Sequence, residues 1–122
     1  MILVLTFLAG ALGAVARFVA DAELRRRVLP DGPWATVLIN VSGSLVLGGL
    51  AAWAHRSASG ESALAILGTG FCGGYTTFST ASYETMRLIE QRRYTVAVLS
   101  GAGGLVLAVA ASLLGWAAIA AS

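Results

Sequence analysis

Four long apolar stretches account for most of this 122-residue chain. They span approximately residues 2–20, 34–54, 62–83 and 94–121, and Arg17 is the only charged residue inside them. A helix needs about 20 predominantly apolar residues to cross the hydrocarbon core of a bilayer. Soluble domains carry about a quarter charged residues, whereas this chain carries 11%. The sequence therefore predicts an all-α membrane protein whose single domain, residues 1–122, contains four transmembrane helices.

The basic residues are distributed unevenly between the ends of these stretches, and all eight are arginines. If every stretch crosses the membrane, the connections after the first and third share one side, and Arg56 lies alone on the other. The seven arginines on or next to the shared side are Arg17, Arg25, Arg26, Arg27, Arg87, Arg92 and Arg93. Because cytoplasmic loops are enriched in basic residues, this distribution predicts a single orientation with both termini outside.

Gly68, Gly70 and Gly73 match the G-x-G-x-x-G spacing of dinucleotide-binding loops. That function requires a strand, a tight turn and a helix within a βαβ unit, and the sequence offers no alternation of strands and helices. We interpret the segment as a transmembrane helix broken near its middle, at Gly73 and Gly74. Four hydroxyl residues follow, namely Thr76, Thr77, Ser79 and Thr80. A break frees backbone carbonyl groups to bind a cation and N–H groups to bind an anion. At membrane depth, these unpaired backbone groups must be hydrogen-bonded by protein or by water in a cavity.

Small residues recur four positions apart in three of the stretches. The pairs are Ser44 with Gly48, Gly70 with Gly74, and Ser100 with Gly104. Such pairs let helix backbones approach closely within lipid, so these positions are predicted helix contacts.

Two further residues are candidates for chemistry inside the membrane. Asn40 lies within an uncharged helix, where its amide needs a hydrogen-bond partner. It serves either a functional site or an interhelical hydrogen bond, and both readings stay open. Phe78 either packs or offers its electropositive ring edge to an anion. Cys72 is predicted to be a small buried residue, and with one cysteine and one histidine, His55, the chain cannot assemble a Cys/His metal cluster.

Three segments of the sequence resemble one family of small four-helix fluoride channels, called Fluc or CrcB. They are "GALGAVARF" (10–18), "INVSGS" (39–44) and "GTGFCGGYTTFST" (68–80), in the order and spacing of the family. The resemblance implies a dimer of two antiparallel subunits in the bacterial inner membrane. It also implies passive export of cytoplasmic fluoride, which gives fluoride resistance without nucleotide or catalysis.

The resemblance also implies roles for individual residues. Backbone carbonyls of Gly73 and Thr76 would hold a structural sodium ion at the dimer centre. Asn40 would donate its amide to fluoride, and Phe78 would offer its ring edge. The remaining implied positions are Ser79 and Thr80 in the wall of a polar vestibule, Ser100 in a polar track on the fourth helix, and Arg17 as a structural or electropositive residue.

The sequence departs from the family at positions that would line the pore. Ala81 stands where the family usually has a second phenylalanine, and Gly104 and Ala108 stand where the polar track would continue from Ser100. The arginine asymmetry also argues against one chain inserting in both orientations. Both observations favour a heterodimer with an oppositely oriented paralogue over a homodimer.

Two other functions remain as alternatives. A small multidrug or guanidinium transporter coupled to protons needs a carboxylate inside the membrane, and the nearest candidate, Glu84, is expected to be a solvated charge at a helix end. A nonconducting partner subunit of a channel would use Asn40 and Phe78 for packing alone. An enzyme is not expected, because no nucleophile, base and orienting group converge.

Overall fold

The structure, a computed structural model, describes residues 1–122 and is entirely helical. In chain order its helices are α1 (Ile2–Arg27), α2 (Trp34–Ala54), α3 (Gly60–Ala63), the π-helix η1 (Leu64–Cys72), α4 (Gly73–Tyr75), α5 (Phe78–Glu90) and α6 (Tyr94–Ala120). Three of them, α1, α2 and α6, are long and apolar enough to cross a membrane. The third predicted span is divided among α3, η1, α4 and the start of α5. The predicted all-α class is therefore confirmed.

The helix α1 continues past its apolar stretch as far as Arg27. Its last turns are stabilised by ion pairs one helical turn apart, from Arg25 to Asp21 at 3.0 Å and from Arg27 to Glu23 at 2.6 Å. Such pairs support a helix whose side chains no longer face an apolar environment. The helix therefore ends in a charged segment rather than at the last apolar residue.

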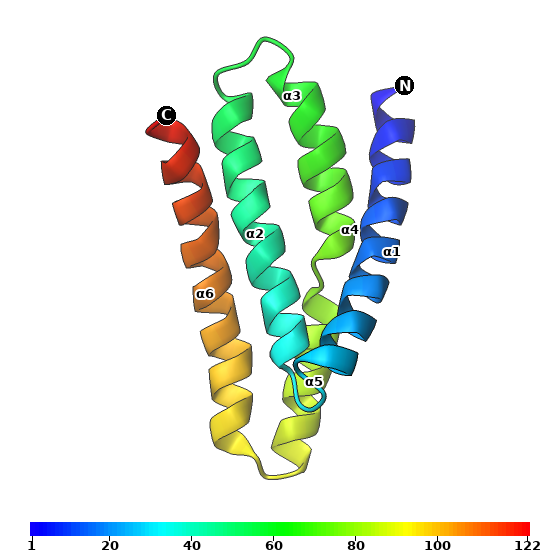
Figure 1. The fold of residues 1–122 in the computed structure, drawn as a ribbon, viewed down its shortest axis with the longest axis vertical. Coiled ribbons are helices and arrows are strands. Elements are labelled where there is room, and N and C mark those ends of the chain that lie inside the picture. The colour runs from blue at the N-terminus through cyan, green and yellow to red at the C-terminus, as the bar shows by residue number, and fades with distance from the viewer.

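The chain passes along the bundle four times in alternating directions, as α1, α2, the segment from α3 to α5, and α6. Both termini lie at the same end of the bundle (Figure 1). The connection from α2 to α3 shares that end, whereas the α1–α2 and α5–α6 connections lie toward the opposite end. α2 packs along α6, and both η1 and α4 pack against α1. After α4 the chain leaves α1, and α5 packs mainly against α6. The third segment thus changes its main neighbour at the junction between α4 and α5.

A single chain encloses little interior. Only 19 of the 122 residues are buried, and Ile39 is the one large side chain that is fully enclosed. Large apolar side chains along α1 and α6, such as Phe7, Leu12 and Leu113, are mostly exposed. In a membrane protein this surface faces lipid tails or another subunit, because exposing so extensive an apolar surface to water is unfavourable.

The predicted close contact at Gly48 joins α2 to α6. A Cβ atom at Gly48 would overlap the backbone carbonyl of Ser112 on α6, and one at Gly115 would overlap the carbonyl of Leu45 on α2. The missing side chains therefore let the two backbones touch. In lipid, packing of this kind replaces the hydrophobic effect as the force that holds helices together.

Substituting Gly48 with alanine is expected to destabilise the α2–α6 pair. Overpacking a well-fitted contact costs about 1–3 kcal/mol, and here the obstacle is backbone that cannot rotate away. Gly49→Ala is the matched control, since its Cβ would meet Ile119 at an ordinary 3.5 Å. Thermal unfolding in detergent should show a lower midpoint for G48A than for G49A, and equal midpoints would contradict this account of the contact.

The same kind of contact joins the third segment to α1. A Cβ at Gly74 would overlap the carbonyl of Gly10, so α4 lies directly on the α1 backbone. Next to it, Cys72 is 2% exposed and unpaired, and its predicted burial is confirmed.

Arg56 caps the end of α6 near the termini. Its guanidinium donates to the carbonyls of Ile119 at 3.0 Å and Ala120 at 2.6 Å. The last carbonyls of a helix lack partners within the helix and carry partial negative charge. The one arginine at this end of the bundle therefore ties the α2–α3 connection to α6.

Candidate functional site

The chain between α4 and α5 is extended at two consecutive threonines. Thr76 has φ −79° and ψ 158°, and Thr77 has φ −146° and ψ 119°. The Thr76 hydroxyl donates to the carbonyl of Cys72 at 2.8 Å, and the Thr77 hydroxyl accepts from the N–H of Thr80 at 3.1 Å. Thr77 is thus the N-cap of α5. Threonine side chains compete with the helical hydrogen-bond ladder in this way, which explains why α5 begins afresh here.

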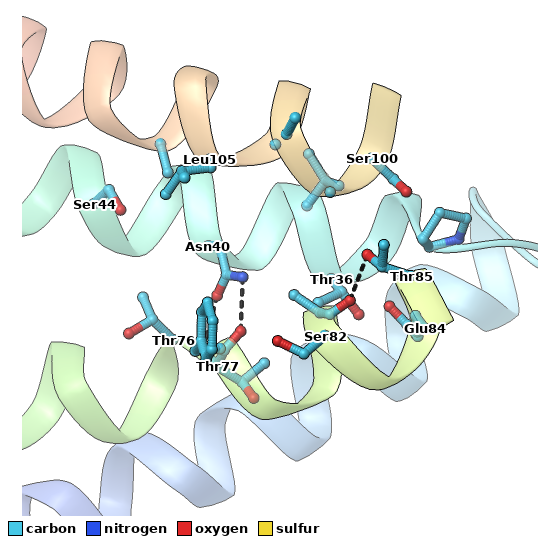
Figure 2. A pocket seen from close by; sticks show the side chains of 18 of the residues that line it. Thr36, Asn40, Ser44, Thr76, Thr77, Ser82, Glu84, Thr85, Ser100 and Leu105 are labelled. Atoms are coloured by element: carbon cyan, nitrogen blue, oxygen red, sulfur yellow. Dashed lines mark hydrogen bonds between the residues drawn. The ribbon is translucent and has the colours of Figure 1, made fainter. Parts of the chain in front are cut away.

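Asn40 on α2 binds both backbone groups of Thr77. Its Nδ2 donates to the Thr77 carbonyl at 2.9 Å, and its Oδ1 accepts from the Thr77 N–H at 2.7 Å. Figure 2 shows the Asn40 amide directed at Thr77 across the gap between the two helices. Because a backbone N–H can only donate, the oxygen of the amide must face it, and this fixes the orientation of the side chain. The second hydrogen on Nδ2 is left free.

These hydrogen bonds leave carbonyl groups at the junction without helical partners. In an α-helix the carbonyl of Gly73 would accept from the N–H of Thr77, and that of Thr76 from the N–H of Thr80. Here the Thr77 N–H donates to Asn40, and the Thr80 N–H donates to the Thr77 hydroxyl. The Thr76 carbonyl accepts no hydrogen bond at all. Backbone carbonyl oxygens without a hydrogen-bond donor are chemically suited to a hard cation.

A cavity of about 590 Å³ opens beside Asn40, between α2, α5 and α6. Phe78 and Ser100, both predicted pathway residues, line it together with Asn40; Figure 2 shows Asn40 and Ser100 in place. The Phe78 side chain is 84% exposed, so its ring is free to meet an ion or a second subunit. The small residues at the positions where the resemblance implied larger or polar ones, Ala81, Gly104 and Ala108, also line this cavity.

Ser100 differs from the other predicted pathway residues in how its donor is used. It is 6% exposed, and its hydroxyl donates to the carbonyl of Val96 one turn earlier, at 2.7 Å. A serine hydroxyl has a single hydrogen. Ser100 therefore presents only lone pairs to the cavity and would have to release Val96 before donating to an anion.

A second cavity, of about 200 Å³, lies between α1, α2 and the first turn of α5. Arg17, Arg25, Thr77 and Thr80 line it, and the Nε of Arg17 is buried without an acceptor. A buried guanidinium N–H without a partner is costly and suits an anion or water. Ser79, predicted beside Thr80, lines neither cavity; it is exposed, with its hydroxyl 3.3 Å from that of Thr77.

The environment of Glu84 differs from the one predicted from the sequence. A solvated charge was expected, but the side chain is 20% exposed, lines the larger cavity and pairs with Arg25 at 2.8 Å. The two residues are 59 positions apart, and no local spacing or motif links them. Sequence reasoning also missed the role of Thr77 as a helix cap, although threonine is among the residues preferred at that position.

Comparison with known proteins agrees with the resemblance to the Fluc or CrcB family that the sequence motifs indicate. A family model described as CrcB-like protein, Camphor Resistance (CrcB), matches residues 4–116. The fluoride-specific ion channel FluC 1 of Leifsonia xyli is 54% identical over 108 residues, which cover 88% of this chain and 79% of the relative. FluC of Novosphingobium aromaticivorans is 44% identical over 87% of this chain and 86% of the relative. FluC 2 of Cutibacterium acnes is 45% identical over 88% of this chain and 89% of the relative. This chain therefore belongs to the CrcB family.

Proposed function

We propose that this chain is a subunit of a fluoride-selective channel that exports cytoplasmic fluoride passively and so gives fluoride resistance. Its relatives in this family carry the name fluoride-specific ion channel. The observation that carries the proposal is the Asn40–Thr77 pair, which holds the helix junction open beside Phe78 at the larger cavity. Fluoride is strongly hydrated, so a narrow route must replace its water with hydrogen-bond donors.

The residues around the junction supply such donors. Asn40 has one free amide hydrogen after binding Thr77, and the exposed Phe78 ring offers a positive edge. Arg17 and Thr80 in the smaller cavity would form an electropositive antechamber, and the exposed hydroxyl of Ser79, next to Thr80 in the chain, would lie outside it. Ser100 would contribute on α6 once its hydroxyl turns from Val96.

We also propose that the carbonyls of Gly73 and Thr76 hold a structural sodium ion together with the same groups of a second subunit. Uncharged backbone oxygens suit a hard monovalent cation. The diversion of the Thr77 and Thr80 N–H groups supports this assignment, because it leaves both carbonyls without their helical donors. A bound cation would supply positive charge that favours an anion nearby.

Removal of sodium is expected to weaken the assembly. If the ion joins two subunits, exchange into N-methylglucamine should lower the midpoint of thermal unfolding, because a ligand bound only by the folded state stabilises it by mass action. Potassium should restore the midpoint less well than sodium. A midpoint that is the same in all three cations would contradict the sodium site.

The second subunit is proposed to be an antiparallel paralogue. Ala81, Gly104 and Ala108 give the larger cavity neither a ring nor a side-chain donor at these three positions, and a partner with the missing groups would supply them. The numbered names FluC 1 and FluC 2 among the relatives support genomes with more than one such gene. The arginine bias supports one fixed orientation, with both termini outside the inner membrane.

Coexpression of two differently tagged copies tests this assembly. The heterodimer proposal expects poor self-capture and efficient capture of an oppositely oriented paralogue. Efficient self-capture into a conducting dimer would overturn it and leave a homodimer with altered pores.

The multidrug or guanidinium transporter remains the alternative of a different class. Proton coupling needs a carboxylate that can exchange its proton, and Glu84 is held by Arg25. A nonconducting subunit is the other alternative. Growth of a fluoride-sensitive host in fluoride medium separates these functions: rescue by this chain with its partner supports the channel, and export of guanidinium without rescue would refute it.

A further inference from the structure

Arg25 joins three parts of the molecule through all three of its side-chain nitrogens. Its Nε donates to Asp21 on α1 at 3.0 Å, and its Nη1 donates to the carbonyl of Gly32 in the α1–α2 connection at 3.0 Å. Its Nη2 donates to Glu84 on α5 at 2.8 Å. The side chains of Arg25 and Glu84 are 31% and 20% exposed. A guanidinium held in three directions has little freedom to release any one partner.

The Arg25–Glu84 pair also lies between the two cavities. Arg25 lines the smaller cavity and Glu84 lines the larger one. Thr36 and Thr77 line both, so the two spaces are neighbours. In Figure 2, Glu84 lies with Thr85 on α5 at the end of the larger cavity where Ser100 faces them from α6.

Only one of the two carboxylate oxygens of Glu84 has a hydrogen-bond donor. Oε1 accepts from Arg25, whereas Oε2 is buried and has no hydrogen-bond donor. A carboxylate at the wall of an anion route repels the ion, and the repulsion is stronger away from bulk water. The Arg25 guanidinium weakens this repulsion, because it holds a positive charge next to the carboxylate.

We propose that Arg25 is a positioning residue for fluoride passage, which fixes and neutralises the Glu84 carboxylate in the wall between the two cavities. The proposal rests on the function proposed above. Asp21 contributes indirectly, because it orients the guanidinium that reaches Glu84. Without Arg25, the freed carboxylate would present an unopposed negative charge to the anion.

Four variants test this role in the conducting assembly. Arg25→Gln is expected to lower fluoride flux about tenfold, since an uncompensated charge near the route raises the barrier. Glu84→Gln alone should change flux much less. The double variant R25Q/E84Q should recover most of the lost flux, because the harmful charge is gone. Arg27→Gln is the matched control, since it removes an arginine from the same helix end whose partner, Glu23, lines neither cavity.

Asp21→Asn provides a second route if R25Q fails to fold. It keeps every arginine but loosens the guanidinium, and its smaller loss of flux should also be reversed by E84Q. A double variant as slow as R25Q would overturn the proposal, because Arg25 would then act only by holding helices together. Equal fluxes for R25Q and R27Q would overturn it as well. Failure of the parent assembly to conduct fluoride would instead refute the proposed function.

Discussion

Replacing Asn40 with alanine is expected to reduce fluoride flux at least about 100-fold, since the change removes a donor to the ion and the support of the helix junction together. Asn40 is the only side chain that binds both backbone groups of Thr77. Without it, the Thr77 N–H and carbonyl lose their partners, at a cost of about 1–3 kcal/mol for each group left unsatisfied. The N–H would then be free to bond with Gly73, which would close the junction into helix.

Ser44→Ala is the control for this prediction. Ser44 lies one turn further along α2 and lines the same cavity, but its hydroxyl makes no hydrogen bond within the chain. S44A should therefore conduct nearly as well as the parent. If N40A remains folded and conducts like S44A, Asn40 has only a packing role, and the proposed donation of its amide to fluoride is wrong.

Replacing Ala81 with phenylalanine is expected to raise the fluoride flux of the chain on its own by about tenfold or more, because each ring edge or donor added along a route lowers its barrier. Ala81 lies three residues after Phe78 on α5 and lines the larger cavity, which has room for a ring. Ala81→Leu is the control, since it fills similar space without a ring edge. A gain with leucine equal to that with phenylalanine would show that filling the cavity matters and ring chemistry does not.

The long helices could be predicted from the sequence because apolar length alone decides them. The predicted stretch 34–54 coincides with α2, and the Gly48 contact follows from the spacing of small residues. The end of α1 at Arg27 was missed, since ion pairs one turn apart extend the helix beyond its apolar part.

The site could be predicted only where one residue carries the signal. An amide in an apolar helix must find a partner, so Asn40 was recognisable, but the identity of that partner, Thr77, depends on how α2 packs against the junction. The pairing of Arg25 with Glu84 depends on the approach of α1 to α5 and has no local signature. The commitment of the Ser100 hydroxyl to Val96 is likewise a rotamer choice that composition does not reveal.

Fluoride efflux from liposomes tests the central claim most directly, with an ionophore to dissipate the voltage and chloride as the control anion. Liposomes that contain this chain with an oppositely oriented paralogue are expected to release fluoride and retain chloride, and the chain alone is expected to release much less. Silence from a folded protein both alone and with the paralogue, or equal release of chloride, would contradict a fluoride channel subunit.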